Sequence, residues 1–415
     1  MPCWDALGFM REVNNLPMSW VRDLEPRARD AAGYLRMMAI IVTITFAFRA
    51  TNSMIPPTMS LIAKDLGFGE SEIGALALTF MGCTFISSAF INARLRSGRR
   101  RAFFMVASWA YSLVFPFFYF SGPITLWILA ALAGFSLGFV MPNIMTAAGG
   151  AGRDRKSVER ALALYTLALS TSLMVSPSLE GLILRYFTLR EAFLLFEPIA
   201  LLVGALSPAL PFPEEGARGG ALARGVLRSP GFAVSLLNQL AYQIPFAFIV
   251  TFSSIYAVQR FSATNSAAIF LYVAFYATSF AARFALTARP AENLTALMIL
   301  SATLTLMGLF AAWAAPSIII YAAALAILGI PHGLTYTISV ISLSRVFDMK
   351  TRNAANSYFS STMMLIGAFL PALLGILADL MGLRTAILVL VIPVAIVFAA
   401  TLALARRLVV LLGSS

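Results

Sequence analysis

The chain has 415 residues, of which 60% are hydrophobic and only 12% are charged, and its mean hydropathy is +0.85. A typical soluble domain has about 25% charged and about 45–50% apolar residues. This composition excludes a disordered chain, a collagen and a disulfide-rich secreted domain, and it predicts an integral membrane protein. The net charge of +12 does not indicate nucleic-acid binding, because the basic residues lie in short segments between long apolar runs.

The charged segments divide the chain into five parts. Residues 1–33 contain many charged side chains and no apolar core of the kind that a signal peptide needs, so we expect an N-terminal segment in the cytoplasm. Residues 34–211 hold six apolar runs and residues 229–410 hold six more. Residues 212–228 are rich in Pro, Gly, Glu and Arg, which is typical of a linker, and residues 411–415 form a short tail.

Each of the twelve apolar runs is long enough to cross a bilayer, which takes about 20 residues in a helix. The sequence lacks the alternation of apolar and polar residues that a membrane barrel needs. We therefore predict an all-α integral membrane protein with twelve transmembrane helices. The predicted spans are 35–57, 71–92, 101–121, 124–146, 159–184, 190–211, 229–258, 263–287, 291–313, 316–343, 353–379 and 383–408.

The basic residues predict the orientation of these spans. With both termini inside the cell, 24 of the 30 Lys and Arg residues fall in or next to cytoplasmic segments, five fall outside, and the remaining one, Arg49, lies within the first span. This bias follows the positive-inside rule. We therefore expect a multi-pass protein of the plasma membrane with cytoplasmic N- and C-termini.

An internal repeat relates the two groups of six spans. Residues 177–192 and 371–386 are 194 positions apart, and Pro, Gly, Leu, Arg and Ala match in register between them. An even number of spans separates the copies, so both have the same orientation in the membrane. Two parallel six-helix halves are typical of secondary transporters.

The link between the second and third spans carries a recognisable motif. Residues 91–100 resemble the pattern G-x-x-x-D-R-x-G-R-R, although Ile91 and Leu95 replace its first Gly and its Asp. Together with the twelve spans and the repeat, this motif resembles the major facilitator superfamily over nearly the whole chain. In that family the Asp latches the two halves on the cytoplasmic side. The retained part of this cytoplasmic gate motif is Arg96, Gly98, Arg99 and Arg100.

The resemblance also implies which helices line the transport path. In the family, spans 1, 4, 7 and 10 line a central cavity, spans 2, 5, 8 and 11 flank it, and the others are peripheral. Polar side chains recur at helical spacing on several lining and flanking spans. The residues that we predict to bind substrate are Arg49, Asn52, Asn143, Asn238, Gln239, Tyr242, Gln243, Tyr276, His332, Tyr336 and Asn356. Hydrogen bonds between helices are the alternative explanation for the polar residues of the seventh span.

Arg49 is the most informative single residue, because a charge this deep in a span needs a partner or a water-filled cavity. A guanidinium binds carboxylate or phosphate groups, so Arg49 could bind an anionic substrate. The alternative is a structural ion pair with Glu180 in the fifth span. Near the end of that span, residues 176–181 read S-P-S-L-E-G, which only weakly resembles the antiporter motif G-P-x-x-G-G.

Three other ionisable residues stand out within the spans. Glu180 is the predicted coupling carboxylate, since a buried carboxyl group could take up and release a proton. His332 could carry a proton as well, although a lone His is often a hydrogen-bonded packing residue. Glu197 lies in a peripheral span, where we expect packing. With one His and two cysteines, Cys3 and Cys83, the chain suggests no metal site, no disulfide framework and no cofactor.

These observations predict a secondary active transporter that acts as a monomer. It would move a small organic solute by alternating access, with a proton as the coupling ion and an organic anion favoured by Arg49. An exporter of drug-like amphiphiles is the alternative within the class, and a membrane sensor that does not transport is the alternative of another class. An enzyme is not expected, because the spans lack paired Asp residues and a Ser/His or metal constellation.

Overall fold

A computed structural model gives the conformation of most of the chain. It describes residues 18–150, 155–210, 212, 224–289, 293–347 and 349–412, and within these ranges every regular element is a helix. The start of the predicted N-terminal segment, most of the predicted linker and the last three residues lie outside the described residues.

The N-terminal half contains six long helices. They are α2 (Met18–Asp65), α3 (Glu70–Phe85), α4 (Ser97–Phe117), α5 (Pro123–Gly149), α6 (Arg155–Ile183) and α7 (Leu189–Leu206). A π-helical turn, η1 (Ile86–Ile91), and a 3₁₀ turn, η2 (Asn92–Arg94), continue α3. Two more short 3₁₀ turns follow α4 and α7, namely η3 (Phe118–Phe120) and η4 (Ser207–Ala209).

The C-terminal half begins with the one-turn helix α8 (Arg224–Leu227). The long helices are α9 (Pro230–Phe261), α10 (Asn265–Ala288), α11 (Leu294–Ala314), α12 (Ile318–Val346), α13 (Met349–Val389) and α14 (Val391–Leu412). Proline is the first residue of both α5 and α9, where its missing N–H removes no hydrogen bond from the helix.

The described helices account for the twelve predicted spans once one break is recognised. Eleven stretches are long and apolar enough to cross a membrane, and the last of them, Ala355–Ala405, has 51 residues. Gly382 interrupts this stretch with a φ of +79°, a backbone angle that residues other than glycine rarely adopt. The break divides the stretch into an eleventh and a twelfth span, so the predicted all-α fold is confirmed.

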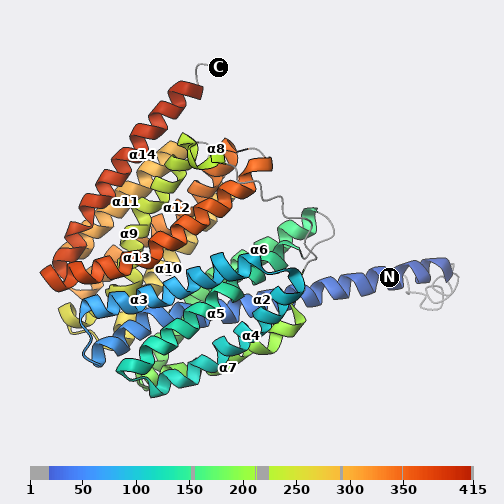
Figure 1. The fold of residues 1–415 in the computed structure, drawn as a ribbon, viewed down its shortest axis with the longest axis horizontal. Coiled ribbons are helices and arrows are strands. Elements are labelled where there is room, and N and C mark those ends of the chain that lie inside the picture. Colours follow the sequence, from blue (N-terminus) through green and yellow to red (C-terminus); the bar gives the residue numbers. More distant parts are fainter. Residues whose placement is uncertain are drawn as a thin grey trace, which may run out of the picture.

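The two halves are built in the same way. In the N-terminal half, α2 packs on α6, α3 on α5 and α4 on α7, and in the C-terminal half α10 packs on α12 and α9 on α14. The halves meet through α3 with α13, α6 with α10 and α2 with α9. Figure 1 shows the two bundles converging at one end and diverging toward the other end, where the C-terminus lies and from which α2 projects toward the N-terminus.

The end at which the bundles converge, which we call the closed end, is held by polar contacts between the halves. Asp379, at the end of the eleventh span, accepts hydrogen bonds of 2.9 Å from the backbone N–H groups of Glu70 and Ser71 at the start of α3. The Nε2 atom of Gln259 donates to Oε1 of Glu70 at 3.1 Å. Lys64 forms an ion pair of 2.7 Å with the same oxygen. Glu70 is therefore contacted from both halves.

Small residues allow the backbones of the two halves to approach closely at this end. A Cβ atom on Gly74 of α3 would lie 3.0 Å from the carbonyl carbon of Pro371 in α13. Ser266 of α10 donates to the carbonyl oxygen of Gly181 in α6 at 2.6 Å. The opposite end, from which the linker runs between α7 and α8, is called the linker end below.

Candidate functional site

Two arginines from opposite halves lie within membrane-spanning helices. Arg49 lies in the middle of the membrane-spanning part of α2, and Arg283 lies near the linker end of α10. Both side chains are partly exposed. Arg283 was not among the predicted site residues, because it was counted with the basic residues of a cytoplasmic link.

The described residues provide no acidic partner for this pair of cations. The salt bridge found in the described part of the chain joins Lys64 to Glu70, far along α2 from Arg49. The alternative interpretation of Arg49 as the ion-pair partner of Glu180 is therefore wrong.

Glu180 lies instead in the packed interface between α6 and α2. Its side chain is 1% exposed, and its Oε1 atom accepts a hydrogen bond from the Thr58 hydroxyl. One turn earlier, Ser176 donates to the carbonyl oxygen of Ala50 at 2.6 Å. This places a carboxyl group inside the N-terminal half without a cation beside it. Glu197, in contrast, is half-buried on α7, which packs on α4 and α2.

His332 of α12 lies among aromatic rings near the two arginines. Its ring stacks on Phe246 with a centroid distance of 4.7 Å and an interplanar angle of 23°. Its centroid is 5.0 Å from that of Phe275 and 5.9 Å from those of Tyr242 and Tyr276. Nδ1 and the Ser279 hydroxyl are 2.7 Å apart, so one ring nitrogen already has a partner and the ring orientation is fixed.

Three tyrosines lie on helices of the same region. Tyr276 is two turns before Arg283 on one face of α10, Tyr165 lies on α6 and Tyr336 lies on α12. Tyr276 is buried, whereas Tyr336 is 50% exposed. Tyr165 of α6 is a second residue that the sequence analysis missed. Guanidinium groups and phenol hydroxyls are all hydrogen-bond donors, so this arrangement is suited to the oxygens of an anion.

Three of the other predicted residues bond to neighbouring helices. Asn238 of α9 donates to the hydroxyl of Ser339 on α12 at 2.9 Å. The Tyr242 hydroxyl donates to the carbonyl oxygen of Leu328 at 2.8 Å, and Asn143 of α5 donates to Oδ1 of Asn92 at 3.0 Å. The contacts of Asn238 and Tyr242 are the interhelical bonds that we considered as the alternative for the seventh span.

The remaining amides keep unused polar atoms. The side-chain oxygens of Asn52, Gln239 and Asn356 are buried without a hydrogen-bond partner. Such atoms are costly unless water or a ligand satisfies them. Gln243 lies beside Gly367 of α13, because a Cβ atom added to Gly367 would be 2.9 Å from the Nε2 atom of Gln243. Both residues line a narrow space between α2, α3, α9 and α13.

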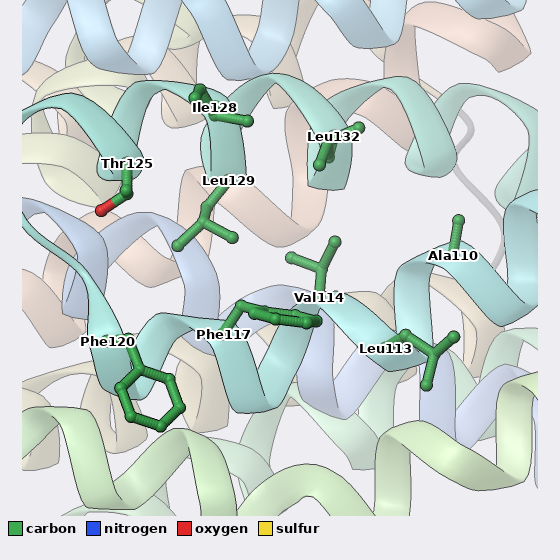
Figure 2. A pocket seen from close by; sticks show the side chains of 9 residues that line it. All are labelled: Ala110, Leu113, Val114, Phe117, Phe120, Thr125, Ile128, Leu129 and Leu132. Carbon is green, nitrogen blue, oxygen red and sulfur yellow. The ribbon is translucent and has the colours of Figure 1, made fainter.

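An apolar groove of about 450 Å³ lies elsewhere, between α4 and α5. It is lined by Phe117, Phe120, Ile128 and other apolar side chains (Figure 2). These side chains are exposed on the surface of a protein with membrane-spanning helices. The groove contains none of the predicted site residues, and it is therefore not part of the candidate site.

The gate motif lies at the linker end, at the start of α4. Arg96 is its N-cap residue, and Arg96, Gly98 and Arg99 are exposed, whereas Arg100 is buried. Leu95, which replaces the Asp of the family motif, is half-buried. Among the described residues, no group of three His, Cys, Asp or Glu side chains could hold a metal ion.

A polar centre between two bundles of membrane-spanning helices defines a multi-pass membrane transporter. The chain belongs to the Major Facilitator Superfamily, because the sequence profile of that family matches residues 41–293. This confirms the resemblance found in the sequence. Comparison with curated proteins gave no match.

Solved structures have the same fold at low sequence identity. A bacterial homolog of the human lysosomal transporter Spinster, in an inward-facing and occupied conformation, is 14% identical with a TM-score of 0.70, over 91% of this chain and 97% of that one. The nucleoside transporter NupG is 13% identical with a TM-score of 0.66, over 89% and 99%. A POT family transporter in complex with 5-aminolevulinic acid is 11% identical with a TM-score of 0.70, over 90% and 96%.

Proposed function

We propose that this protein is a secondary active transporter that moves a small organic anion across the plasma membrane by alternating access. The observation that carries the proposal is that Arg49 of α2 and Arg283 of α10 are partly exposed cations within membrane-spanning helices, with no salt-bridge partner among the described residues. A guanidinium in such a place needs a partner or water. The group that we propose as the partner of Arg49 is an anionic group of the substrate.

The arrangement of the two halves supports alternating access. The contacts of Asp379 and Gln259 with Glu70 and Ser71 join the halves at the closed end. The positive-inside rule places the linker end in the cytoplasm, so the closed end faces outside. In this state substrate would enter or leave on the cytoplasmic side, and separation of the halves at the closed end would open the other side.

Glu180 is the residue that we propose for proton coupling. It is buried between α6 and α2, and its Oε1 atom accepts a hydrogen bond from Thr58. A carboxylate charge without a cation beside it is costly in such an environment. Binding and release of a proton at Glu180 would therefore change how tightly the two helices pack, and α2 also carries Arg49.

The second candidate is export of drug-like amphiphiles. It is favoured by the aromatic surroundings of His332, where Phe246 and Phe275 stack on or beside the imidazole ring. Such a surface could hold the apolar part of a substrate. An amphiphilic anion would use both features, whereas a neutral or cationic amphiphile would leave the arginines without a partner.

Transport into proteoliposomes tests the proposal. Purified protein should take up one or more organic anions when a pH gradient is imposed, and uptake should fall at least tenfold in Arg49→Gln. The matched control is Arg289→Gln, which removes an exposed arginine at the end of α10. Uptake of neutral or cationic amphiphiles but of no anion would favour the exporter, and absence of flux for every solute would overturn the transporter assignment.

A further inference from the structure

The groove between α4 and α5 lies in the part of the N-terminal half that is near the closed end. It follows the last part of α4 and the first part of α5, on either side of the loop that joins the two helices. Figure 2 shows Phe120 and Thr125 at the loop end of the groove, and Ala110 and Leu132 at the other end. We propose that this groove binds one acyl chain of a phospholipid whose phosphate group contacts Arg190.

The local sequence explains why the end of α4 leaves this space beside α5. Pro116 lies in the last turn of α4, where it cannot donate a backbone hydrogen bond, and the chain continues as the 3₁₀ turn η3. Phe117 and Phe120, which follow this proline, line one wall of the groove, and Ile128 lines the opposite wall. All three side chains are exposed, so an apolar partner can reach them from the membrane.

The dimensions of the groove fit a single hydrocarbon chain. Its α5 wall runs from Thr125 to Leu132, which is about 10 Å at 1.5 Å per residue. A volume of about 450 Å³ over this length gives a mean cross-section of about 45 Å². An α-helix about 10 Å in diameter has a cross-section of about 80 Å². A helix of a second copy is therefore too thick for the groove, whereas a chain of CH₂ groups, which contact their neighbours at about 4 Å, can lie in it.

The type of side chain in the groove also favours a lipid over a helix. Membrane helices approach each other through small residues such as Gly, Ala and Ser. Most of the residues that line this groove are instead Leu, Ile, Val and Phe. Their branched and aromatic side chains keep a second helix at a distance and provide many contacts for a flexible chain.

Arg190 supplies a positive charge at the loop end of the groove. It is the second residue of α7. Its Nη2 atom donates to the carbonyl oxygen of Ser121 at 3.1 Å, and its Nε atom donates to the hydroxyl of the same residue at 3.4 Å. Ser121 directly follows Phe120, which lines the groove. Two of the five N–H groups of the guanidinium are used in this way, and Arg190 forms no salt bridge among the described residues.

This charge determines which membrane component the groove retains. The acyl chains of a bilayer are as apolar as the groove, so the groove alone does not select one lipid. A basic side chain at the level of the headgroups attracts a phosphate and can donate further hydrogen bonds to it. With the linker end in the cytoplasm, the lipid belongs to the outer leaflet.

The location of the site within one half separates this lipid from a transported substrate. Both walls of the groove and Arg190 belong to the N-terminal half. A movement of one half against the other therefore leaves the site intact. The lipid would stay bound in every transport state, and its binding does not depend on the proposed substrate.

Native mass spectrometry of the full-length protein in detergent tests the proposal with two probes that have the same chains. The probes are dioleoyl phosphatidylglycerol and dioleoylglycerol, which lacks the phosphate group. One molecule of phosphatidylglycerol should be retained at least tenfold more tightly than dioleoylglycerol. Equal retention of the two probes would overturn the proposal.

A variant that fills the groove tests where the chain lies. Leu113→Trp places a larger side chain in the groove and should reduce retention of phosphatidylglycerol at least tenfold. The matched control is Leu373→Trp on α13, because Leu373 is also exposed but does not line the groove. If wild-type protein is a dimer that Leu113→Trp converts into a monomer without a change in lipid retention, the groove is an interface between copies and the proposal is wrong.

Arg190→Gln tests the contact with the phosphate group and should reduce retention of phosphatidylglycerol at least fivefold. The matched control is Arg384→Gln, since Arg384 is the counterpart of Arg190 in the internal repeat and donates to the carbonyl oxygen of Trp313 at 3.3 Å. Arg190→Lys keeps the charge and should keep the preference for phosphatidylglycerol over dioleoylglycerol. A melting curve checks the fold of each variant. Unchanged retention in Arg190→Gln, or an equal loss in Arg384→Gln, would overturn the proposal, and if Arg190→Gln does not fold, loss of the preference in Arg190→Lys would do so.

Discussion

The contact of Asp379 with α3 is predicted to control how readily the closed end opens. The N-cap residue of α3 is Gly69, which has no side chain to accept hydrogen bonds from the first N–H groups of the helix. Asp379 supplies that acceptor from the other half, with bonds of 2.9 Å to the N–H groups of Glu70 and Ser71. When the halves separate at this end, the start of α3 loses its cap.

The size of the effect follows from what a helix cap contributes. Loss of an N-cap side chain costs about 0.5–2 kcal/mol, and a negative charge at a helix N-terminus contributes about 0.3–1 kcal/mol. Asp379→Ala removes both, so the ratio of open to closed molecules should rise about 4- to 140-fold at 1.4 kcal/mol per factor of ten. Asp379→Asn keeps an acceptor and loses only the charge, so it should shift the ratio about two- to fivefold.

Double electron–electron resonance can measure this ratio directly. Spin labels at Tyr186→Cys and Ile319→Cys would report on the two halves near the closed end, since these residues are 84% and 76% exposed. The native cysteines, Cys3 and Cys83, are replaced by Ser. Asp379→Ala should enlarge the population with the longer distance, and Asp379→Asn should do so to a smaller extent.

The control for this experiment breaks a cap within one half. Glu72 accepts a hydrogen bond from the N–H of Gly69 at 2.8 Å, and both residues belong to the same half. Glu72→Ala removes this acceptor and should leave the distance distribution as it is in the wild type. Identical distributions for Asp379→Ala and the wild type would refute the reasoning, and so would equal shifts from Glu72→Ala and Asp379→Ala.

Two further predictions concern the packing between the halves and the buried carboxyl group. Gly74→Ala should open the closed end in the same resonance assay, because the new Cβ meets the backbone of Pro371 across the interface and overpacking costs about 1–3 kcal/mol. Gly82→Ala on the same helix, where a Cβ meets nothing within 4 Å, should have no effect. Glu180→Gln should abolish uptake driven by a pH gradient while exchange of substrate across the membrane persists, because an amide cannot take up the coupling proton. Glu197→Gln should retain both activities, and loss of both activities in Glu180→Gln would point to a structural role instead.

The sequence predicts the fold because each span is set by its own composition. A run of about 20 apolar residues has to cross the bilayer whatever its neighbours do. The sequence also predicts a break between the spans 353–379 and 383–408, and the structure has it at Gly382. The rest of the stretch from Met349 to Val389 is helical, so the turn between the two spans depends on the conformation of this one residue.

The candidate site could be predicted only in part. Arg49 stands out because it is charged and far from either end of its span, whereas Arg283 lies near a span end and looks like one more residue of the positive-inside pattern. Its spacing of four and seven residues from Ser279 and Tyr276 was the signal that could have identified it. Tyr165 has the same spacing of seven residues from Ser172 on α6.

The hydrogen-bond partner of Glu180 could not be predicted from the sequence, for a physical reason. Whether Glu180 pairs with Arg49 or with Thr58 depends on the rotation of α6 against α2, which the two helices settle only when they pack. A helical pattern fixes which residues share a face of one helix, but not which residue of the next helix that face meets.

The length of α2 determines how far its N-terminal end would move when the N-terminal half rotates. This helix has 48 residues, and Figure 1 shows it projecting well beyond the bundle toward the N-terminus. At 1.5 Å per residue it is about 72 Å long. A rotation of its half by about 15°, as in known rigid-body transitions, about the closed end would move its far end by about 20 Å. The helix that carries Arg49 is thus also a lever arm, which amplifies a small change at the substrate site into a large displacement outside the membrane.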